Sequence, residues 1–503
     1  MIAKLTHYIR AGYAGLYLVS REEQRVEAEL KAIAANLSHR LFAWSATAGL
    51  IDTADGASRG CEDPMEVLGA VAGLPENSIV LLRDYHVFFE DPNPMLIRMV
   101  KDQVRQGKLK GKTLAVLGCR LKLPPELERE FTVVDFALPG AEALRQVLSG
   151  ILESATTEGR TTVQPDQEAT AVLIDAARGL TSSEAEDAFA LSMVESGQLQ
   201  AAIVAREKAQ AVKKNGLLEL IETTESLASI GGLDLLKDWL GKRREAFTPR
   251  AIEYGLPTPK GVLMLGIPGC GKSLTAKATA SVFGVPLLRL DAGRIFAGLV
   301  GQSESNLRSV TQTAEAIAPC VLWIDEVEKG FAGSRSSGAT DGGTSSRVFG
   351  SFLSWVQEKT APVFIVATAN DVSQVPPEML RKGRFDEMFF IDLPNREERE
   401  AIWQIQITKF GREPGSFDLR QLARTTDGFT GSEIEQAFIE ALYRAFERDE
   451  EPTDLTIGEA LTDFVPLSKL MGGEIASVRS WAKGRARPAT NQERERPGRK
   501  IAS

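Results

Sequence analysis

The run Gly266-Ile-Pro-Gly-Cys-Gly-Lys272-Ser273 combines the residue types that bind a triphosphate. Glycines let the backbone turn tightly and aim its N–H groups at phosphate oxygens. An apolar segment precedes the run and an alanine-rich, helix-type segment follows it, so a helix N-terminus should face the anion. Lys272 is expected to reach the β- and γ-phosphates, and the Ser273 hydroxyl to bind Mg²⁺. The predicted nucleotide contacts here are Gly266, Pro268, Gly269, Cys270, Gly271, Lys272, Ser273 and Leu274.

Two carboxylates, Asp325 and Glu326, follow the apolar run 321–324. A phosphate loop needs a second strand that ends in an acid, because the metal and the attacking water both lie beside the γ-phosphate. Asp325 is predicted to hold Mg²⁺ and Glu326 to polarise the water. The alternative is a strand-end turn that happens to contain two acids.

A third apolar run, residues 363–369, ends at Asn370, whose amide is suited to orient the water or sense the γ-phosphate. Arg381 and Arg384 come just before the next apolar run. An arginine aimed at the transition-state charge accelerates phosphoryl transfer by about 10³ to 10⁵. Both arginines are therefore predicted to be catalytic, with surface salt bridging as the alternative for each. The predicted catalytic set is Lys272, Glu326, Asn370, Arg381 and Arg384.

Together these motifs resemble the AAA ATPase family over residues 228 to about 450. The segments SIGGLD, GIPGCGKS, LWIDE, ATAN, LRKGRFD and GFTGSE carry the resemblance. It implies adenine contacts at Ile230, Gly231 and Gly431. It also implies that the two arginines act on the neighbouring subunit's ATP in a ring of identical chains, usually a hexamer. Over its whole length the sequence is similar to the cyanobacterial and algal-plastid group named hypothetical chloroplast reading frame forty-six.

Apolar strands that alternate with helices predict an α/β fold with a parallel sheet and ATP at the carboxyl ends of its strands. The resemblance makes this a P-loop NTPase sheet with a helical lid, preceded by a degenerate AAA-like α/β domain. The predicted domains are a degenerate domain at 1–200, a helical connector at 201–227, an ATPase sheet domain at 228–394, a lid at 395–470 and a basic, disordered tail at 471–503.

Rings of this family commonly thread a polypeptide past loops lined with aromatic residues. The matching stretch here, FAGLVGQSESNLRS, has Leu299 and Val300 at the gripping positions. Both are apolar but not aromatic, so a peptide grip is predicted without strong processive unfolding, and local packing is the alternative. The Gly/Ser-rich segment 330–347 is predicted to be a mobile loop.

The first half contains a weak internal repeat of the second. GLTSSEAEDAF at 179–189 resembles GFTGSEIEQAF at 428–438, and both contain a TxxE capping box. Capping alone would explain this pair, but not four further matches that keep the same order. These are 15–19 with 261–265, 80–84 with 321–325, 123–126 with 375–378, and 138–139 with 393–394.

The repeat predicts that the first half is an AAA-like module that has lost its chemistry. After residue 19 the loop reads Ser20-Arg-Glu-Glu23, without glycine or lysine, and its carboxylates would repel a triphosphate. The alignment puts Tyr85 where the second copy has Glu326, and LRKGR is shortened to LERE. We therefore predict a non-hydrolysing domain for partner binding or ring assembly.

Composition limits the class of protein. A net charge of −9 argues against a surface built wholly for nucleic acid, although the basic tail could contact one. Scattered cysteines without a CxxC pair, and only three histidines, argue for a reducing compartment and against a thiolate or imidazole metal site. No apolar run approaches the roughly 18 residues of a membrane span. A cytoplasmic location and no signal peptide are expected.

The leading prediction is an enzyme that hydrolyses ATP with Mg²⁺ and remodels a protein partner. The runner-up is an ATP-gated regulatory or scaffold protein with slow turnover. A nucleic-acid motor or loader suits the basic tail but not the acidic chain.

Overall fold

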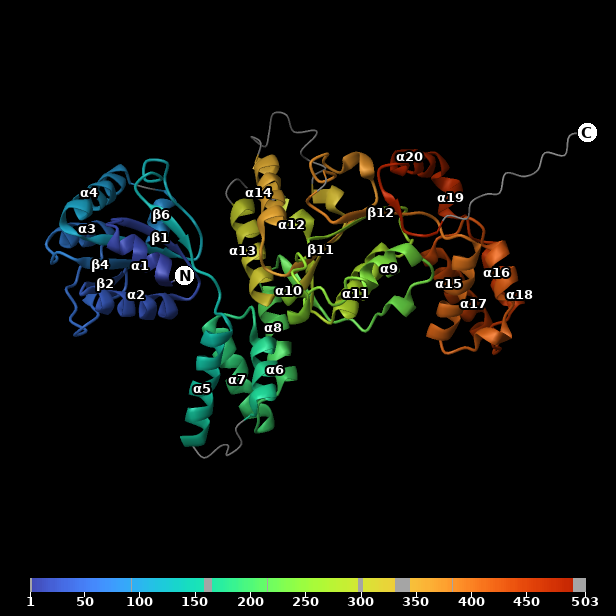
Figure 1. Ribbon diagram of the computed structural model, residues 1–503, viewed down its shortest axis with the longest axis horizontal. Helices are drawn as coiled ribbons and strands as arrows, with labels where there is room; N and C mark the ends of the chain where they lie inside the picture. The colour runs from blue at the N-terminus through green and yellow to red at the C-terminus, as the bar shows by residue number, and fades with distance from the viewer. Residues whose placement is uncertain are drawn as a thin grey trace, which may run out of the picture. The chain divides into compact units, whose positions relative to one another are not determined.

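Short apolar runs form the strands of two separate sheets, one in each half of the chain (Figure 1). The computed structural model describes residues 2–91, 93–157, 165–214, 216–296, 302–330, 344–381 and 383–491. The chain divides into two units, Met1–Ala211 and Val212–Ser503. Each unit is described by itself below.

The first sheet has the strand order β3-β2-β4-β5-β1-β6 in the part of the chain that the structure describes. Neighbouring strands are parallel except β2 and β3. β1 is buried along its whole length, as expected for a parallel sheet covered on both faces. The strands are β1 (Gly15–Val19), β2 (Arg40–Ser45), β3 (Gly49–Asp52), β4 (Ser78–Arg83), β5 (Thr113–Gly118) and β6 (Thr132–Asp135).

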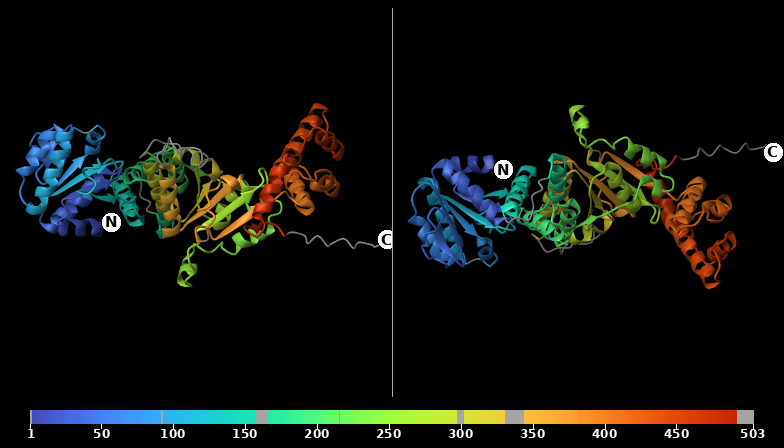
Figure 2. Two further views of the ribbon diagram at one scale, coloured as in Figure 1. Left: turned by 90° about the horizontal axis from the view of Figure 1, so that it is seen from above. Right: turned by 90° about the horizontal axis from the view of Figure 1, so that it is seen from below.

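Helices cover both faces of this sheet (Figure 2). One face packs on α1 (Ile2–Arg10) and α2 (Glu23–Leu37), and the other on α3 (Pro64–Ala72) and α4 (Pro94–Lys110). A further helical group has a core of its own around Phe189. It comprises α5 (Ala141–Thr157), α6 (Gln167–Ala177), α7 (Ser182–Ser196) and the first part of α8 (Ala201–Lys214).

The second sheet has the strand order β13-β12-β8-β11-β10-β9-β7, and all described pairs are parallel except β7 with β9. One face packs on α9 (Asp234–Gly241) and α11 (Lys272–Phe283), and the other on α13 (Gln302–Ile317) and α14 (Thr344–Glu358). The strands are β7 (Leu218–Ile221), β8 (Gly261–Gly266), β9 (Leu287–Leu290), β10 (Cys320–Ile324), β11 (Val363–Ala369), β12 (Glu387–Ile391) and β13 (Arg487–Pro488).

A helical lid follows the second sheet. Its core is built around Trp403 and Phe438, whose ring centroids lie 6.3 Å apart in an edge-on arrangement. The lid helices are α15 (Arg396–Lys409), α16 (Leu419–Thr425), α17 (Gly431–Glu447) and α18 (Asp454–Leu461), and they are followed by α19 (Leu467–Leu470) and α20 (Gly472–Ala482).

The two sheets share a strand order. β6-β1-β5-β4-β2 in the first corresponds to β12-β8-β11-β10-β9 in the second, and each has an antiparallel strand added at the same end. The segments matched by sequence fall on equivalent elements, β1 with β8 and β4 with β10. The capping boxes at Thr181 and Thr430 both form, at the starts of α7 and α17. This agreement supports a duplication.

The structure differs from the sequence prediction at two connecting segments. Residues 218–221, expected in a helical connector, form β7, because Leu218 and Leu220 pack onto the core beside β9. The predicted disordered tail is helical at α20 and extended at β13, with Ile475, Ala482 and Ala489 buried. A few well-placed apolar residues are enough to order a segment whose composition is mainly polar. Residues 492–503 lie outside the described part of the chain.

No helix among the described residues is long and apolar enough to cross a membrane.

Candidate nucleotide site

The glycine-rich loop joins β8 to α11. A Cβ on Gly266 would lie 2.0 Å from the carbonyl oxygen of Ile391 in β12, so only glycine fits at the end of β8. Gly271 has a φ of 90°, and the chain then turns directly into α11 at Lys272. The free N–H groups at the N-terminus of α11 therefore face the loop, in the arrangement that binds anions.

Lys272 is nearly fully buried. Its Nζ donates hydrogen bonds to the carbonyl oxygens of Gly266 and Ile267, both at 2.8 Å. Burial lowers the pKa of Lys272 to about 8, because the charged ammonium loses hydration. Nearby carboxylates, including Glu328 and Asp325, act in the opposite direction and help retain the proton.

Asp325 and Glu326 follow β10 at the carboxyl edge of the sheet, and Thr368 in the neighbouring strand β11 fixes both. The Thr368 hydroxyl donates to Asp325 Oδ1 at 2.7 Å and accepts the backbone N–H of Glu326 at 3.0 Å. Glu326 itself has a left-handed backbone, with φ at 47°. Arg289 Nη2 lies 3.6 Å from Asp325 Oδ2. The acidic pair is thus oriented from two neighbouring strands.

Both carboxylate oxygens of Glu326 have partners. Asn370 Nδ2 donates to Oε1 at 3.1 Å, and Lys329 Nζ lies 2.5 Å from Oε2. The backbone N–H of Asn370 donates in turn to Glu328 Oε1 at 2.8 Å. Glu328 is buried, and desolvation raises the pKa of its carboxyl. Asn370 is therefore held at its backbone by one glutamate while its side chain contacts another.

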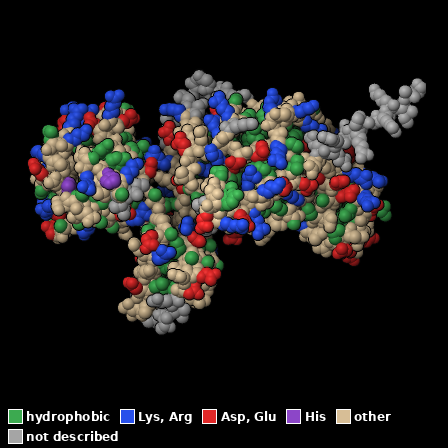
Figure 3. Space-filling model, viewed as in Figure 1, with side chains coloured by type: hydrophobic (Ala, Val, Ile, Leu, Met, Phe, Trp, Pro, Cys, Tyr) green, Lys and Arg blue, Asp and Glu red, His purple; other side chains and the backbone are tan. Residues whose placement is uncertain are grey.

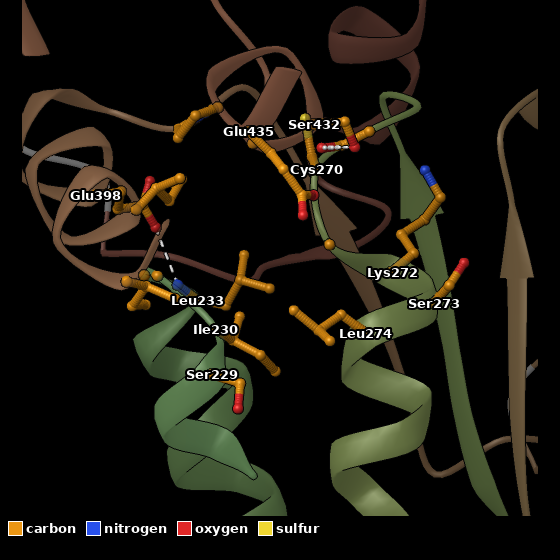
Figure 4. A pocket seen from close by; sticks show the side chains of 18 of the residues that line it. Ser229, Ile230, Leu233, Cys270, Lys272, Ser273, Leu274, Glu398, Ser432 and Glu435 are labelled. Carbon is orange, nitrogen blue, oxygen red and sulfur yellow. Dashed lines mark hydrogen bonds between the residues drawn. The ribbon is translucent and has the colours of Figure 1, made fainter. Parts of the chain in front are cut away.

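A cavity of 1140 Å³ extends from the glycine-rich loop to the lid. Lys272, Asp325, Glu326 and Asn370 line one part of it. Apolar side chains line another part, where Leu274 points from α11 toward Ile230 and Leu233 and away from Lys272 (Figure 4). The cavity therefore offers charged groups for phosphates and an apolar compartment for a base.

The lid contacts the glycine-rich loop through the start of α17. Ser432 donates its backbone N–H to the carbonyl oxygen of Gly269 at 3.1 Å, and Gly431 lines the cavity. Thr430 and Glu433 form the capping box that fixes this helix start. A change in the position of the lid would therefore alter this contact with the loop.

The buried Glu398 joins three segments. Its Oε1 accepts the backbone N–H of Leu233 at 2.9 Å and the Thr490 hydroxyl at 2.6 Å, while Oε2 accepts the backbone N–H of Asn395 at 2.9 Å. The lead-in to the sheet, the first lid helix and the C-terminal segment thus meet at one carboxylate beside the apolar compartment.

Most residues predicted from the sequence lie around this cavity, including Ile230, Gly231 and the loop residues from Pro268 to Leu274. Gly266 lies behind the loop and accepts the Lys272 hydrogen bond instead of lining the cavity. Arg381 is exposed and Arg384 half-buried, and neither is among the lining residues; Arg384 donates to the carbonyl oxygen of Glu378. Leu299 and Val300, and most of the segment 330–347, lie outside the described residues.

Sequence reasoning missed Thr368, Lys329, Glu398 and Thr490. Thr368 lies in β11 within the ATAN motif, two residues before Asn370, and this spacing, which places both side chains on one face, was the available signal. Lys329 lies three residues after Glu326, a spacing that allows contact within one turn. Glu398 and Thr490 are 92 residues apart, and no local pattern connects them.

The carboxyl edge of the first sheet has different residues at the matching places. Asp84, with φ at 51°, precedes the 3₁₀ helix η1 (Tyr85–Phe89), just as Glu326 precedes η3 (Val327–Gly330). The structure therefore pairs Asp84, and not Tyr85, with Glu326. The sequence alignment paired Asp84 with Asp325 and was therefore offset by one residue from the structural equivalence. Tyr85 is instead a buried core residue packed against Trp44.

Cation and anion positions are also exchanged in the first sheet. Arg83 takes the place of Asp325 and pairs with Glu23 and Glu27. The buried Glu22, in the loop after β1, accepts the backbone N–H of Ser182 at 2.6 Å. In the second unit the contact comes from the next position of the equivalent helix, because Ser432, which aligns with Ser183, donates its backbone N–H to the loop carbonyl of Gly269. A carboxylate of the chain itself thus lies where the second unit has its glycine-rich loop.

Four segments of the chain match known domain families. Residues 262–393 match the ATPase family associated with various cellular activities (AAA), and residues 416–457 match the AAA+ lid domain. Residues 1–136 match the N-terminal domain, and residues 142–215 the second domain, of SpoVK-like AAA ATPases.

Similarity to whole proteins covers both units. The chain is 39% identical over 494 residues to the AAA domain-containing protein ycf46 of Trieres chinensis, which covers 96% of this chain and 97% of that protein. It is 36% identical to the protein of the same description from Pyropia yezoensis, and this match covers 96% of this chain and 98% of that protein. The human ATPase family gene 2 protein homolog A is 32% identical over 44% of this chain and 25% of its own length.

Proposed function

This chain belongs to the AAA ATPase family, and on that premise we propose that it is an Mg²⁺-dependent ATPase that works in a ring of identical chains and remodels a protein partner. One observation carries the proposal. Lys272, Asp325, Glu326 and Asn370, from three different parts of the sequence, line one cavity at the carboxyl edge of a parallel sheet. Ligands of such sheets bind at this edge.

In this proposal the N–H groups of the glycine-rich loop and the Lys272 ammonium hold the β- and γ-phosphates. Ser273 and Asp325 are hard oxygen donors of the kind that Mg²⁺ prefers, and the metal supplies charge neutralisation at the phosphates when bound. Glu326 accepts a proton from the attacking water, and Asn370 keeps that carboxylate oriented. Ile230, Gly231, Leu274 and Gly431 surround the base.

Arg381 and Arg384 are proposed to act on the ATP of a neighbouring chain. They stand away from the cavity of their own chain, on the segment between β11 and β12. The arginine at the transition state would then come from the next subunit, in addition to Lys272 of the same chain, as an arginine supplied in trans does in other phosphoryl-transfer systems. A closed ring, with six subunits as the usual number in the family, gives every subunit such a neighbour.

A protein is the proposed substrate, gripped at Leu299 and Val300. Nucleic acid is less favoured, because Lys and Arg are interspersed with Asp and Glu over the face seen in Figure 3, and the net charge is −9. The first unit is proposed to be a non-hydrolysing module for partner binding or ring assembly. The exchange of charges at Arg83 and Glu22 supports this role.

The Lys329–Glu326 ion pair favours a second candidate, an ATP-gated scaffold with slow turnover. Lys329 Nζ lies 2.5 Å from Glu326 Oε2, and this ion pair must open before that oxygen can accept a proton. The nucleotide would then set the assembly state, and hydrolysis would reset it slowly.

The Glu326→Gln variant tests the main proposal. It should bind ATP as well as the unchanged protein does and lose hydrolysis by about 100-fold or more, because the base is removed while the loop is intact. Lys272→Ala should lose ATP binding. Glu358→Gln, at an exposed position outside the cavity, is the matched control. Equilibrium nucleotide binding and phosphate release are the measurements. Intact hydrolysis in Lys272→Ala would refute the assignment.

The Lys329→Met variant separates the two candidates. If the ion pair limits turnover, basal hydrolysis should rise by about tenfold, because the Glu326 carboxylate is freed. If the protein is a remodeller, basal hydrolysis should change little, and the Glu326→Gln protein loaded with ATP should retain a protein partner that also stimulates the unchanged enzyme. Stimulation of ATP hydrolysis by DNA or RNA, without a protein, would favour a nucleic-acid motor or loader.

A further inference from the structure

The carboxyl edge of the first sheet carries a cysteine and a histidine that the nucleotide chemistry does not use. Cys119 follows β5 directly, and His86 lies in η1, just after the neighbouring parallel strand β4. Cys119 therefore corresponds to Asn370, which follows β11 in the second sheet. In the second sheet this edge has a glutamate and an asparagine, whereas in the first it has an imidazole and a thiol.

The thiol and the ring are in contact. Cys119 is exposed, and its Sγ lies 3.9 Å from His86 Nε2, within the range of a weak S–H···N hydrogen bond. His86 is only 3% exposed, so its ring is a buried base with one nitrogen facing the thiol. A Cβ on Gly118 would lie 2.6 Å from His86 Nδ1, so glycine is needed for the ring to lie here.

Among the described residues one ring nitrogen has no hydrogen-bond partner, and burial favours the neutral form of the ring. Its Nδ1 is buried without a hydrogen-bond partner among the described residues, and the nearest carboxylate oxygen, Asp84 Oδ1, lies 3.9 Å away. Burial lowers the pKa of His86; the charges around it are Asp84 and Glu90, which oppose the shift, and Arg120 and Lys122, which add to it. A carboxylate on the Nδ1 side favours the tautomer with its proton there, which leaves Nε2 as the acceptor for the thiol proton.

We propose that Cys119 is a base-assisted thiol that exchanges with small anionic disulfides of the glutathione type. The Sγ–H proton passes to His86 Nε2, and Sγ attacks one sulfur of the disulfide. The bond from Sγ to that sulfur forms as the original S–S bond breaks, and the departing thiolate takes the proton back from Nε2. The disulfide is the oxidant, Cys119 is oxidised to the mixed disulfide, and an external thiol reverses the step. The cationic side chain of Lys122 provides the anion preference, because Arg120 is paired with Glu90.

The other three cysteines provide internal controls. Cys320 is buried, and burial raises the pKa of the Cys270 thiol to about 12. Cys61 is half-buried, and the partner of its Sγ is the carbonyl oxygen of Arg59, which cannot accept and return a proton as an imidazole does. Cys119 is the exposed cysteine of the four.

The test measures the exchange rate at each cysteine of the full chain at neutral pH, with oxidised glutathione as the probe and peptide mass spectrometry as the readout. An unassisted thiol is only a few per cent thiolate at this pH, so Cys119 should react roughly tenfold or more faster than Cys61. Reduced dithiothreitol should remove the adduct. His86→Gln should slow Cys119 by about the same factor and leave Cys61 unchanged.

Lys122→Gln is a surface change that keeps the proposal testable if His86→Gln fails to fold. It should slow the reaction with oxidised glutathione but not with the neutral 2-hydroxyethyl disulfide. The proposal is overturned if Cys119 reacts no faster than Cys61 in the unchanged protein, or if a folded His86→Gln variant reacts at the original rate. Equal sensitivity of both probes to Lys122→Gln would overturn the preference for an anionic disulfide.

Discussion

Lys272 is nearly fully buried, yet its proposed role in phosphate binding requires a positive charge. Because burial lowers its pKa to about 8 from 10.5, the unfolded chain holds this proton between pH 8 and 10.5 while the folded chain has released it. The unfolded state then binds more protons, so the contribution of Lys272 to folding stability rises with pH across this window. The cost of the buried ammonium is present in full below pH 8.

A bound triphosphate should reverse this shift, because anionic oxygens favour the ammonium. We expect ATP to bind with uptake of about 0.7 proton per site at pH 8.5, and to lose affinity as the pH rises above 8. Calorimetric titrations in two buffers of different ionisation enthalpy measure the uptake.

Lys272→Arg should abolish the proton uptake, since arginine stays protonated. Lys359→Arg should leave it unchanged, because Lys359 also has a pKa lowered to about 8 but does not line the cavity. Binding without proton uptake in the unchanged protein would contradict this assignment.

At the scale of elements, the C-terminal segment contacts three elements around the candidate nucleotide site. β13 pairs with β12, the Ala489 carbonyl accepts the N–H groups of Leu235 and Leu236 at the start of α9, and Thr490 binds Glu398. These contacts join the sheet edge, the lead-in and the lid beside the apolar compartment.

Removal of the Thr490 hydroxyl should therefore weaken both folding and nucleotide binding. Thr490→Val is expected to cost about 1–2 kcal/mol of unfolding free energy, because a buried carboxylate loses a hydrogen bond. A chain that ends at residue 486 should lose more and bind ATP more weakly. Thr462→Val, which removes an exposed hydroxyl bonded locally to Glu459, is the control. Denaturant unfolding and equilibrium binding measure the two effects. Equal losses from both threonine variants would argue against the role of this segment.

The sequence predicted those features whose signal lies within a few consecutive residues. The phosphate loop, the acidic strand end and the capping boxes each lie within a few residues, and their physical signals do not depend on the rest of the chain. β7 and β13 could not be predicted in this way, since each is a short strand ordered by its neighbour. The contact of Thr490 with Glu398 joins two separate elements, and the one-residue offset at Asp84 appeared only when backbone geometry was compared.

At the scale of the whole molecule, the proposed ring makes a prediction about mixtures. Arg384→Ala subunits should keep an intact ATP site but provide no arginine to their neighbours. Glu326→Gln subunits should provide the arginine but lack the base. Each variant alone should hydrolyse ATP at least about 100-fold more slowly than the unchanged chain. Mixing the two should restore part of the activity, because some interfaces combine a working site with a working arginine.

Phosphate release from mixtures across a range of ratios measures the recovery. Arg396→Ala is the matched control, since Arg396 is an exposed arginine paired with Glu400 on a lid helix. It should be active alone. No recovery in mixtures, together with a monomeric mass in the presence of ATP, would refute the ring.

Both outer strands of the second sheet are poor templates for a further chain. At one edge, β13 is two residues long, is charged at Arg487 and includes Pro488, which has no N–H to donate. At the other edge, β7 is four residues long and carries Glu219. Neither edge strand is suited to pair with a strand of a neighbouring copy and extend the sheet into a fibre. Copies of this chain should therefore associate through side chains on their surfaces, which can separate and rejoin at each turnover without backbone hydrogen bonds having to break.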